Sequence, residues 1–182
     1  MERDQVITLN PVSHPDRRVR QVGFGLTDPY VEQCWSAVVG PSTTLLLRRL
    51  PELWREHQPA QIEASELGRS LGLSASMAKH SPLAYTLGRL VRFRFAQPVG
   101  QQRDNLDVFV EVAPLMAHQL AKVPQWTRNA HDRLLDAHLE QFDGVSEHQA
   151  KIDAATARLD RAQFGHDQAP TAAPAIPKSL ER

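Results

Sequence analysis

Apolar residues recur at helical spacing in two successive stretches that begin near residues 28 and 41. Asp28 followed by Pro29 is typical of a helix start, because the aspartate caps free backbone N–H groups and proline suits the first turn. Gly40 and Pro41 end this helix and begin the next one, which has a wide apolar face. The pattern therefore predicts two consecutive helices, the second ending near residue 57.

A short strand at Ile62 and a short helix follow, and Gly72 is in the position of a C-cap. Ser81 and Pro82 then give a second clear start signal, for a helix that gathers its leucines on one face. Gly72 and Ser81 are nine positions apart, whereas the turn of a helix-turn-helix has three or four residues. Either the second helix starts earlier, near Ser74, or an inserted loop precedes it.

Residues 93–97 and 106–112 alternate between apolar and polar side chains, and the polar loop 98–105 between them contains a glycine. Two such runs around a polar glycine loop predict a β-hairpin. Residues 115–142 return to a helical pattern, with Pro124 as a junction or kink.

The two ends of the chain carry weaker patterns. Pro11, Pro15 and two glycines interrupt residues 1–27, where the spacing of Val22, Phe24 and Leu26 allows at most an edge strand. Residues 165–182 hold three prolines among small side chains and cannot bury enough surface to stay ordered. We therefore expect three parts: a weakly structured segment at 1–27, a folded domain at 28–142, and a partly helical to disordered tail at 143–182.

Composition narrows the class of protein. The chain has 182 residues, with 21 basic and 21 acidic side chains, so it has no overall basic excess. It contains no apolar run near the roughly 18 residues that a membrane helix needs, and its polar N-terminus lacks a secretory signal. Cys34 is the one cysteine, which excludes an intrachain disulfide. We expect a cytoplasmic protein.

The neutral total hides an uneven distribution of charge. Residues 41–103 carry nine basic and four acidic side chains, whereas residues 136–182 carry five basic and eight acidic ones. The net charges of +5 and −3 indicate a basic centre and an acidic tail. A basic centre favours contacts with phosphates, because neutralising them releases counterions.

Two sequence motifs resemble a known class. Residues 65–73, Ser-Glu-Leu-Gly-Arg-Ser-Leu-Gly-Leu, resemble the first helix and turn of many helix-turn-helix proteins. Residues 87–96, Leu-Gly-Arg-Leu-Val-Arg-Phe-Arg-Phe-Ala, resemble a winged-helix recognition helix that runs into its wing. Residues 28–140 as a whole are similar to bacterial winged helix-turn-helix DNA-binding proteins, and most to an uncharacterised group from GC-rich bacteria.

The resemblance implies a mainly α fold with a small β-hairpin and flanking helices. It also implies binding of double-stranded DNA at the nucleoid, as a transcriptional regulator or a nucleoid-associated factor. Polar and basic residues on the second helix and at the hairpin tip suit phosphate oxygens and base edges. These candidate DNA-binding residues are Lys79, His80, Ser81, Tyr85, Arg89, Arg92 and Arg103.

The same residues have a plainer interpretation as solvated surface side chains, with Ser81 as a helix cap. Winged helices also serve protein contacts, so the alternative is a non-enzymatic interaction module within a larger complex. DNA binding would weaken steeply with salt, whereas an apolar protein interface would not.

The first helices offer more apolar area than the expected domain can cover, which predicts a homodimer. The candidate interface residues are Val31, Trp35, Leu46, Leu50 and Trp54.

The sequence contains no motif that indicates a catalytic or metal-binding site. His131 and His138 lie two helical turns apart, roughly 10 Å, which is too far for one metal ion. Cys34 lies among apolar residues, which favours a buried, unreactive thiol. No phosphate-binding glycine loop or catalytic triad motif is present. We therefore expect no enzyme activity, no cofactor and no metal.

Overall fold

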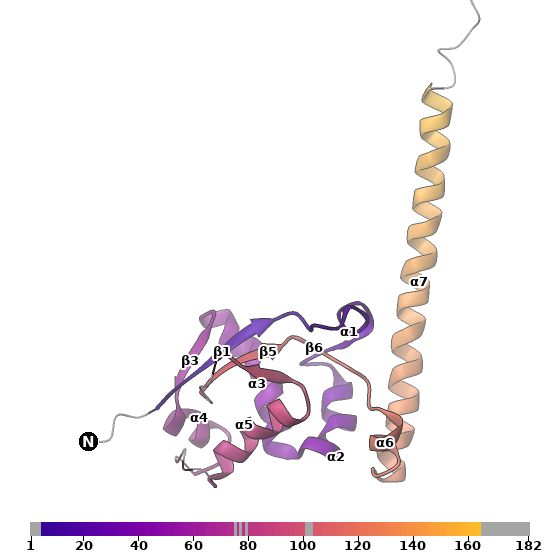
Figure 1. Cartoon of the computed structure of the whole chain (residues 1–182). Helices are drawn as coiled ribbons and strands as arrows, with labels where there is room; N and C mark the ends of the chain where they lie inside the picture. Colours follow the sequence, from indigo (N-terminus) through magenta and orange to yellow (C-terminus); the bar gives the residue numbers. More distant parts are fainter. Residues whose placement is uncertain (1–4, 75, 77, 79, 101–103, 165–182) are drawn as a thin grey trace, which may run out of the picture. The chain divides into compact units, whose positions relative to one another are not determined.

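The computed structural model describes residues 5–164 except 75, 77, 79 and 101–103, and side chains beyond residue 142 only at positions 144 and 152. It forms a mixed α/β fold with many helices and a small sheet (Figure 1). The elements are β1 (Val6–Val12), α1 (Arg17–Val22), β2 (Phe24–Gly25), the π-helical turn η1 (Val31–Trp35), α2 (Ser36–Val39), α3 (Pro41–Glu56), β3 (Ala60–Glu63), α4 (Ala64–Ser70), α5 (Pro82–Arg92), β4 (Ala96–Pro98), β5 (Asn105–Phe109), β6 (Glu111–Val112), α6 (Ala117–Leu120) and α7 (Gln125–Phe164).

The helices begin where their capping residues predict. The Asp28 carboxylate accepts the Tyr30 N–H at 2.7 Å, and the Ser81 hydroxyl accepts the Ala84 N–H at 3.1 Å. Because α5 begins at Pro82, residues 71–81 form a long connection between α4 and α5, and the second helix does not start near Ser74.

The predicted hairpin is confirmed, and it belongs to a larger sheet. β4 and β5 pair antiparallel, with Ala96 opposite Val108. The four-stranded sheet has the order β3-β1-β5-β4, and β2 pairs with β6 in a separate two-stranded sheet. The fold therefore contains more β-structure than a single hairpin.

The expectation of a weakly structured segment at residues 1–27 is wrong. β1 lies inside the sheet, antiparallel to β3 and parallel to β5, and the side chains of Ile7 and Leu9 are fully buried. Partners on both sides satisfy its backbone groups, and its buried residues fill one face of the sheet. Further along the segment, Phe24 is buried and lies in the short strand β2.

The expected dimer interface is also wrong. Val31, Leu46 and Leu50 are fully buried within the chain, and Trp35 and Trp54 are only 4% and 6% exposed. The N-terminal strand supplies part of the missing cover, since Trp54 Nε1 donates to the carbonyl of Leu9 at 2.9 Å. These side chains therefore form the core of one chain and offer nothing to a second copy.

A buried tyrosine ties the first part of α7 to this core. The Tyr30 hydroxyl accepts the backbone N–H of Leu115 at 2.9 Å and shares a second hydrogen bond with His131 Nδ1 at 2.5 Å. The Tyr30 ring stacks on Phe24 at 3.9 Å between ring centroids, and Phe24 stacks on His138 at 4.1 Å. Burial raises the pKa of Tyr30 and keeps its phenol neutral.

Replacing Tyr30 with Phe will lower the free energy of unfolding by about 2 to 4 kcal/mol, because a buried N–H and a buried imidazole nitrogen lose their partner. Urea denaturation measures the change. Tyr85→Phe is the matched control: Tyr85 is 58% exposed and, among the described residues, its hydroxyl bonds to His80, so its loss will change stability by less than about 0.5 kcal/mol. Equal effects of the two variants would contradict the buried network.

The chain divides into two compact units, Met1–Leu139 and Glu140–Arg182. The boundary lies within α7, so this helix contributes residues to both units. Pro124 separates α6 from α7, as expected. The predicted tail is helical as far as Phe164, and the disorder expected at 165–182 lies outside the described residues. In the part of the chain that the structure describes, no helix has the length and hydropathy to cross a membrane.

Candidate nucleic-acid interface

The N-terminal end of α5 gathers three of the candidate residues. His80 and Tyr85 are exposed, and His80 Nδ1 lies 3.2 Å from the Tyr85 hydroxyl. Ser81 is only 6% exposed and its hydroxyl caps the helix, as its plainer interpretation predicts. Lys79 and Arg103 lie outside the described residues.

Arg89 is exposed, but its guanidinium is partly engaged. Its Nη1 donates to the carbonyl of Val39 at 2.8 Å, at the end of α2. Gly40 makes this approach possible: it has φ +79°, and a Cβ there would lie 2.6 Å from the same nitrogen. Arg89 therefore positions α5 against the α2–α3 junction, a role that its place in the sequence does not reveal.

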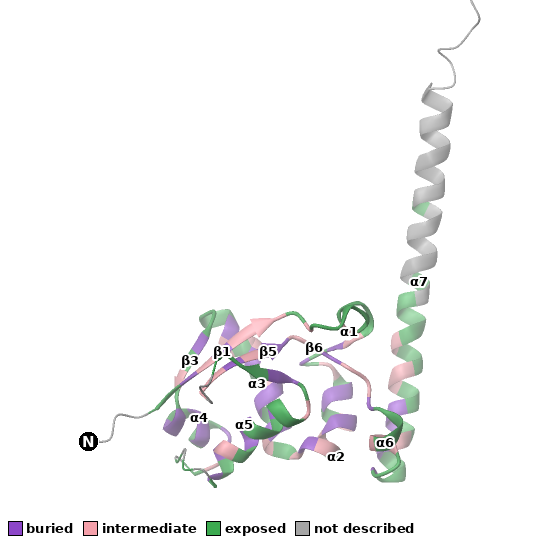
Figure 2. Cartoon of the chain, viewed as in Figure 1, coloured by how far each residue is buried: buried purple, intermediate pink, exposed green. Residues whose placement is uncertain are grey.

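Exposed residues recur along α5, among them Tyr85, Gly88 and Arg92, and Figure 2 colours the exposed positions of the helix green. Tyr85 and Arg92 are seven residues apart, about 10 Å by helix geometry. Gly88 lies between them, and a Cβ there would meet nothing within 4 Å. Alanine in place of an interior helical glycine would stabilise the helix by roughly 1 kcal/mol, so packing does not explain Gly88. A glycine here lets a partner approach the helix backbone closely.

The C-terminal end of α5 has a second residue, after Gly88, that its local conformation does not favour. The N–H of Phe95 bonds to the carbonyl of Leu90 at 2.8 Å, and the N–H of Arg94 to that of Val91 at 3.1 Å. This Schellman motif places Arg94 at φ +59°, where glycine is usual. The preceding helix, α4, ends in the same motif with Gly72 at φ +70°. Arginine in this backbone conformation costs about 1 to 2 kcal/mol relative to glycine.

Strain of this kind is found where a side chain serves a function. The Arg94 side chain is exposed, and Arg92 beside it lies with its guanidinium carbon 5.6 Å from the centre of the Phe93 ring. The sequence does not single out Arg94 as a DNA-binding residue, because nothing in it shows that Arg94 adopts the left-handed conformation.

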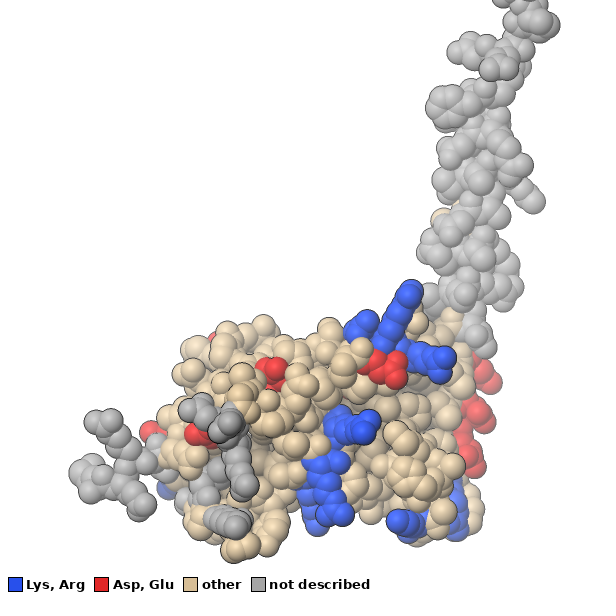
Figure 3. All heavy atoms as spheres, viewed as in Figure 1, with Lys and Arg blue, Asp and Glu red and all other residues tan. Residues whose placement is uncertain are grey.

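The electrostatics of this surface are one-sided. From Leu67 to Arg103 the sequence contains no aspartate or glutamate, and it holds six basic residues, of which Arg69, Arg89, Arg92 and Arg94 are described. The absence of acidic residues from this stretch is visible in the sequence. The net charge of residues 41–103 does not show it, because that range also includes four glutamates. Figure 3 shows basic side chains at the C-terminal end of α5, over α1 and beside α6.

The nearest carboxylates on the hairpin are engaged with neutral partners. Asp104 accepts an amide N–H from Gln5 at 3.1 Å, and Asp107 accepts amide N–H groups from Asn10 and Gln97 at 3.0 and 3.3 Å. They form no ion pair with the arginines of α5 among the described contacts.

Other candidate chemistry is limited in the described residues. Burial raises the pKa of the Cys34 thiol to about 11, although the charge of Arg133 lowers it in part, so the nucleophilic thiolate is scarce near neutral pH. His131 is occupied by Tyr30, and His138 stacks on Phe24. No group of three or more His, Cys, Asp or Glu residues in the described chain is arranged to hold a metal ion.

No protein-family model, no curated protein and no solved structure matches the chain.

Proposed function

We propose that this chain binds double-stranded DNA through α5 and the β4–β5 hairpin, as a winged helix-turn-helix protein that acts as a transcriptional regulator or nucleoid-associated factor. The order α3, β3, α4, α5 and hairpin is the order in which such a domain places its helices and wing. The single observation that carries the proposal is the exposed side of α5, which lies within a stretch of sequence, residues 67–103, that has six basic residues and no aspartate or glutamate.

The roles follow from position along α5. Tyr85 and His80, at its N-terminal end, face solvent as a hydrogen-bonding pair that suits base edges or sugar-phosphate oxygens. Gly88 leaves room for the DNA to approach the helix axis. Arg92 and Arg94, at the C-terminal end, carry permanent charges suited to phosphates. Lys79 and Arg103 extend the basic surface in sequence on either side.

The test compares two exposed arginines. Replacing Arg92 with Ala will weaken binding to a fluorescein-labelled random duplex and reduce the slope of log K against log salt by about 0.9, the amount expected for one phosphate contact. Fluorescence anisotropy at several salt concentrations measures both quantities.

Arg55→Ala is the control. Arg55 is also exposed, but it lies on α3 and forms an ion pair with Glu52, so its replacement will leave the affinity and the slope unchanged. If the two variants bind DNA equally well, the contact surface lies away from α5.

A second candidate function, a protein-interaction module, has one observation in its favour. Trp126 is 63% exposed and lines a hollow of about 170 Å³ with Asn129, Ala130 and Arg133. Tryptophan and arginine are common anchors of protein interfaces. An interface built on Trp126 would lose affinity in Trp126→Ala and would change little with salt, which distinguishes it from DNA binding.

A further inference from the structure

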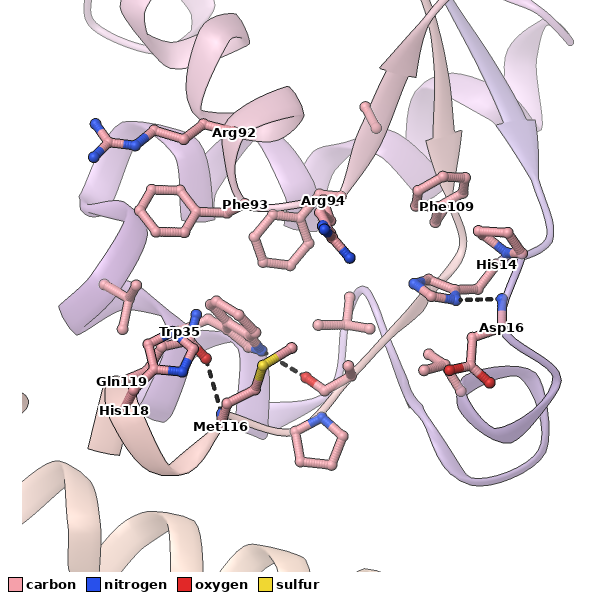
Figure 4. A pocket seen from close by; sticks show the side chains of 18 of the residues that line it. His14, Asp16, Trp35, Arg92, Phe93, Arg94, Phe109, Met116, His118 and Gln119 are labelled. Atoms are coloured by element: carbon pink, nitrogen blue, oxygen red, sulfur yellow. Dashed lines mark hydrogen bonds between the residues drawn. The ribbon is translucent and has the colours of Figure 1, made fainter. Parts of the chain in front are cut away.

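A groove of about 1100 Å³ lies beside the end of α5, bordered by α1, the hairpin strands and α6 (Figure 4). Arg92, Phe93 and Arg94 lie along one side of it. Trp35, Met116, His118 and Gln119 face them from the opposite side. Its size is slightly above the usual range for small-molecule sites.

The charged side chains of the lining are mostly cationic. Arg92, Arg94 and Lys122, all exposed, line the groove, and the imidazoles of His14 and His118 line it as well. Asp16 is the one acidic residue among the lining residues, and its Oδ1 already accepts the Arg18 N–H at 2.8 Å as the cap of α1. A concave surface with an excess of positive charge raises the local concentration of anions.

Aromatic rings held in fixed positions form the floor and walls. Trp35 donates through Nε1 to the carbonyl of Ala113 at 2.9 Å and meets Phe95 edge-on at 4.7 Å. Phe109 packs edge-on against His14 at 4.9 Å. Phe93 is half-buried at the rim, beneath the Arg92 guanidinium. Trp35, Phe95 and Phe109 are only 4%, 2% and 5% exposed, so they form a rigid base beneath the groove, and Phe93 at the rim supplies the ring surface that a flat ligand would contact.

One polar group adds a directed donor. The Gln119 side-chain oxygen accepts the Met116 N–H at 2.8 Å, which leaves its amide N–H groups to donate elsewhere. Cationic donors at the rim, one oriented amide and aromatic walls are together complementary to a ring that carries a negative group.

We propose that this groove binds a small anionic aromatic molecule, one that joins a planar ring to a phosphate or carboxylate, as a nucleotide does. The ring would lie against Phe93, and the anion would lie beside one of the cationic side chains that line the groove, Arg92, Arg94 or Lys122. Duplex DNA does not fit this description, because its bases are stacked and paired inside the helix. The proposal therefore stands apart from DNA binding, although the two surfaces share Arg92 and Arg94.

The experiment titrates the whole chain with N-methylanthraniloyl-AMP, without DNA, and follows energy transfer from tryptophan. The protein carries Trp126→Phe so that the exposed tryptophan does not contribute. We expect saturable binding, at least tenfold weaker for N-methylanthraniloyl-adenosine, which lacks the phosphate. Lys122→Ala will weaken binding of the AMP probe at least threefold, and Arg55→Ala will leave it unchanged.

Three results would overturn the proposal: no saturation below millimolar probe, equal affinity for the two probes, or unchanged affinity in both Lys122→Ala and Arg94→Ala. Circular dichroism shows that each variant is folded. Since DNA is absent from the assay, these results do not depend on whether the chain binds DNA.

Discussion

Leu9→Ala will lower the free energy of unfolding by about 2 to 5 kcal/mol, the range for truncating a fully buried leucine. Leu9 lies in β1, between β3 and β5, and its carbonyl accepts the Trp54 indole N–H. The truncated side chain leaves a cavity at the place where the N-terminal strand meets the helical core. Because domains of this size are stable by only about 5 to 15 kcal/mol, the loss is a large part of the total.

Val6→Ala serves as the control on the same strand. Val6 is 47% exposed, so its truncation will change stability by no more than about 0.5 kcal/mol. Urea unfolding followed by circular dichroism compares the two variants. Equal and small effects would mean that β1 does not pack inside the sheet in solution.

Arg94→Gly will move stability and DNA affinity in opposite directions. Glycine relieves the left-handed backbone at φ +59°, a gain of about 1 to 2 kcal/mol. Its greater freedom in the unfolded chain offsets about 0.4 to 1 kcal/mol of this. The variant will therefore be as stable as the natural chain or up to about 1.6 kcal/mol more stable.

The same substitution removes a phosphate-binding charge in the proposed interface. At about 0.1 M salt, the loss of one contact with a slope of about 0.9 corresponds to roughly eightfold weaker binding of duplex DNA. Thermal melting gives the stability and anisotropy gives the affinity. Most substitutions that weaken a binding surface leave stability unchanged or lower it, so a gain in stability with a loss of affinity marks a residue kept for function.

Arg94→Lys provides the matched control, because it keeps the charge and the strained backbone. It will bind DNA within about twofold of the natural chain and show no gain in stability. If Arg94→Gly binds DNA as well as Arg94→Lys does, then the strain at this position has no connection with DNA binding.

The sequence predicts the helices and the hairpin well because their signals are local. Asp28 and Ser81 cap helices through groups two or three residues away, and the hairpin strands alternate around their own loop. The strand β1 has no comparable local signal and is not predicted from the sequence. Its buried alternation spans only Ile7 and Leu9, and its partners are far along the chain.

The missed strand also explains the mistaken choice of interface residues. If residues 1–27 are left out of the fold, too little of the chain remains to bury the tryptophans of the first helices. In the structure, Trp54 is buried and donates to the carbonyl of Leu9 in β1. An estimate from sequence of how much apolar surface stays exposed is therefore correct only if every segment of the fold has been identified. Even one omitted strand is enough to create an apparent interface.

The site is predictable only in part. Exposure of Tyr85 and Arg92 follows from helical periodicity, and the absence of acidic residues is visible in the sequence. The bond from Arg89 to Val39 spans fifty residues, and the backbone of Arg94 depends on how α5 ends. Neither feature has a local sequence signal, because arginine in itself favours neither arrangement.

The central claim is that α5 presents a DNA-binding surface, and the most direct measurement is a titration of the natural chain with random-sequence duplex at low and moderate salt. We expect binding at low salt and a slope of log K against log salt of roughly −2 or steeper, since Arg92 and Arg94 would each add about 0.9. No binding at low salt, or binding that does not change with salt, would contradict the claim.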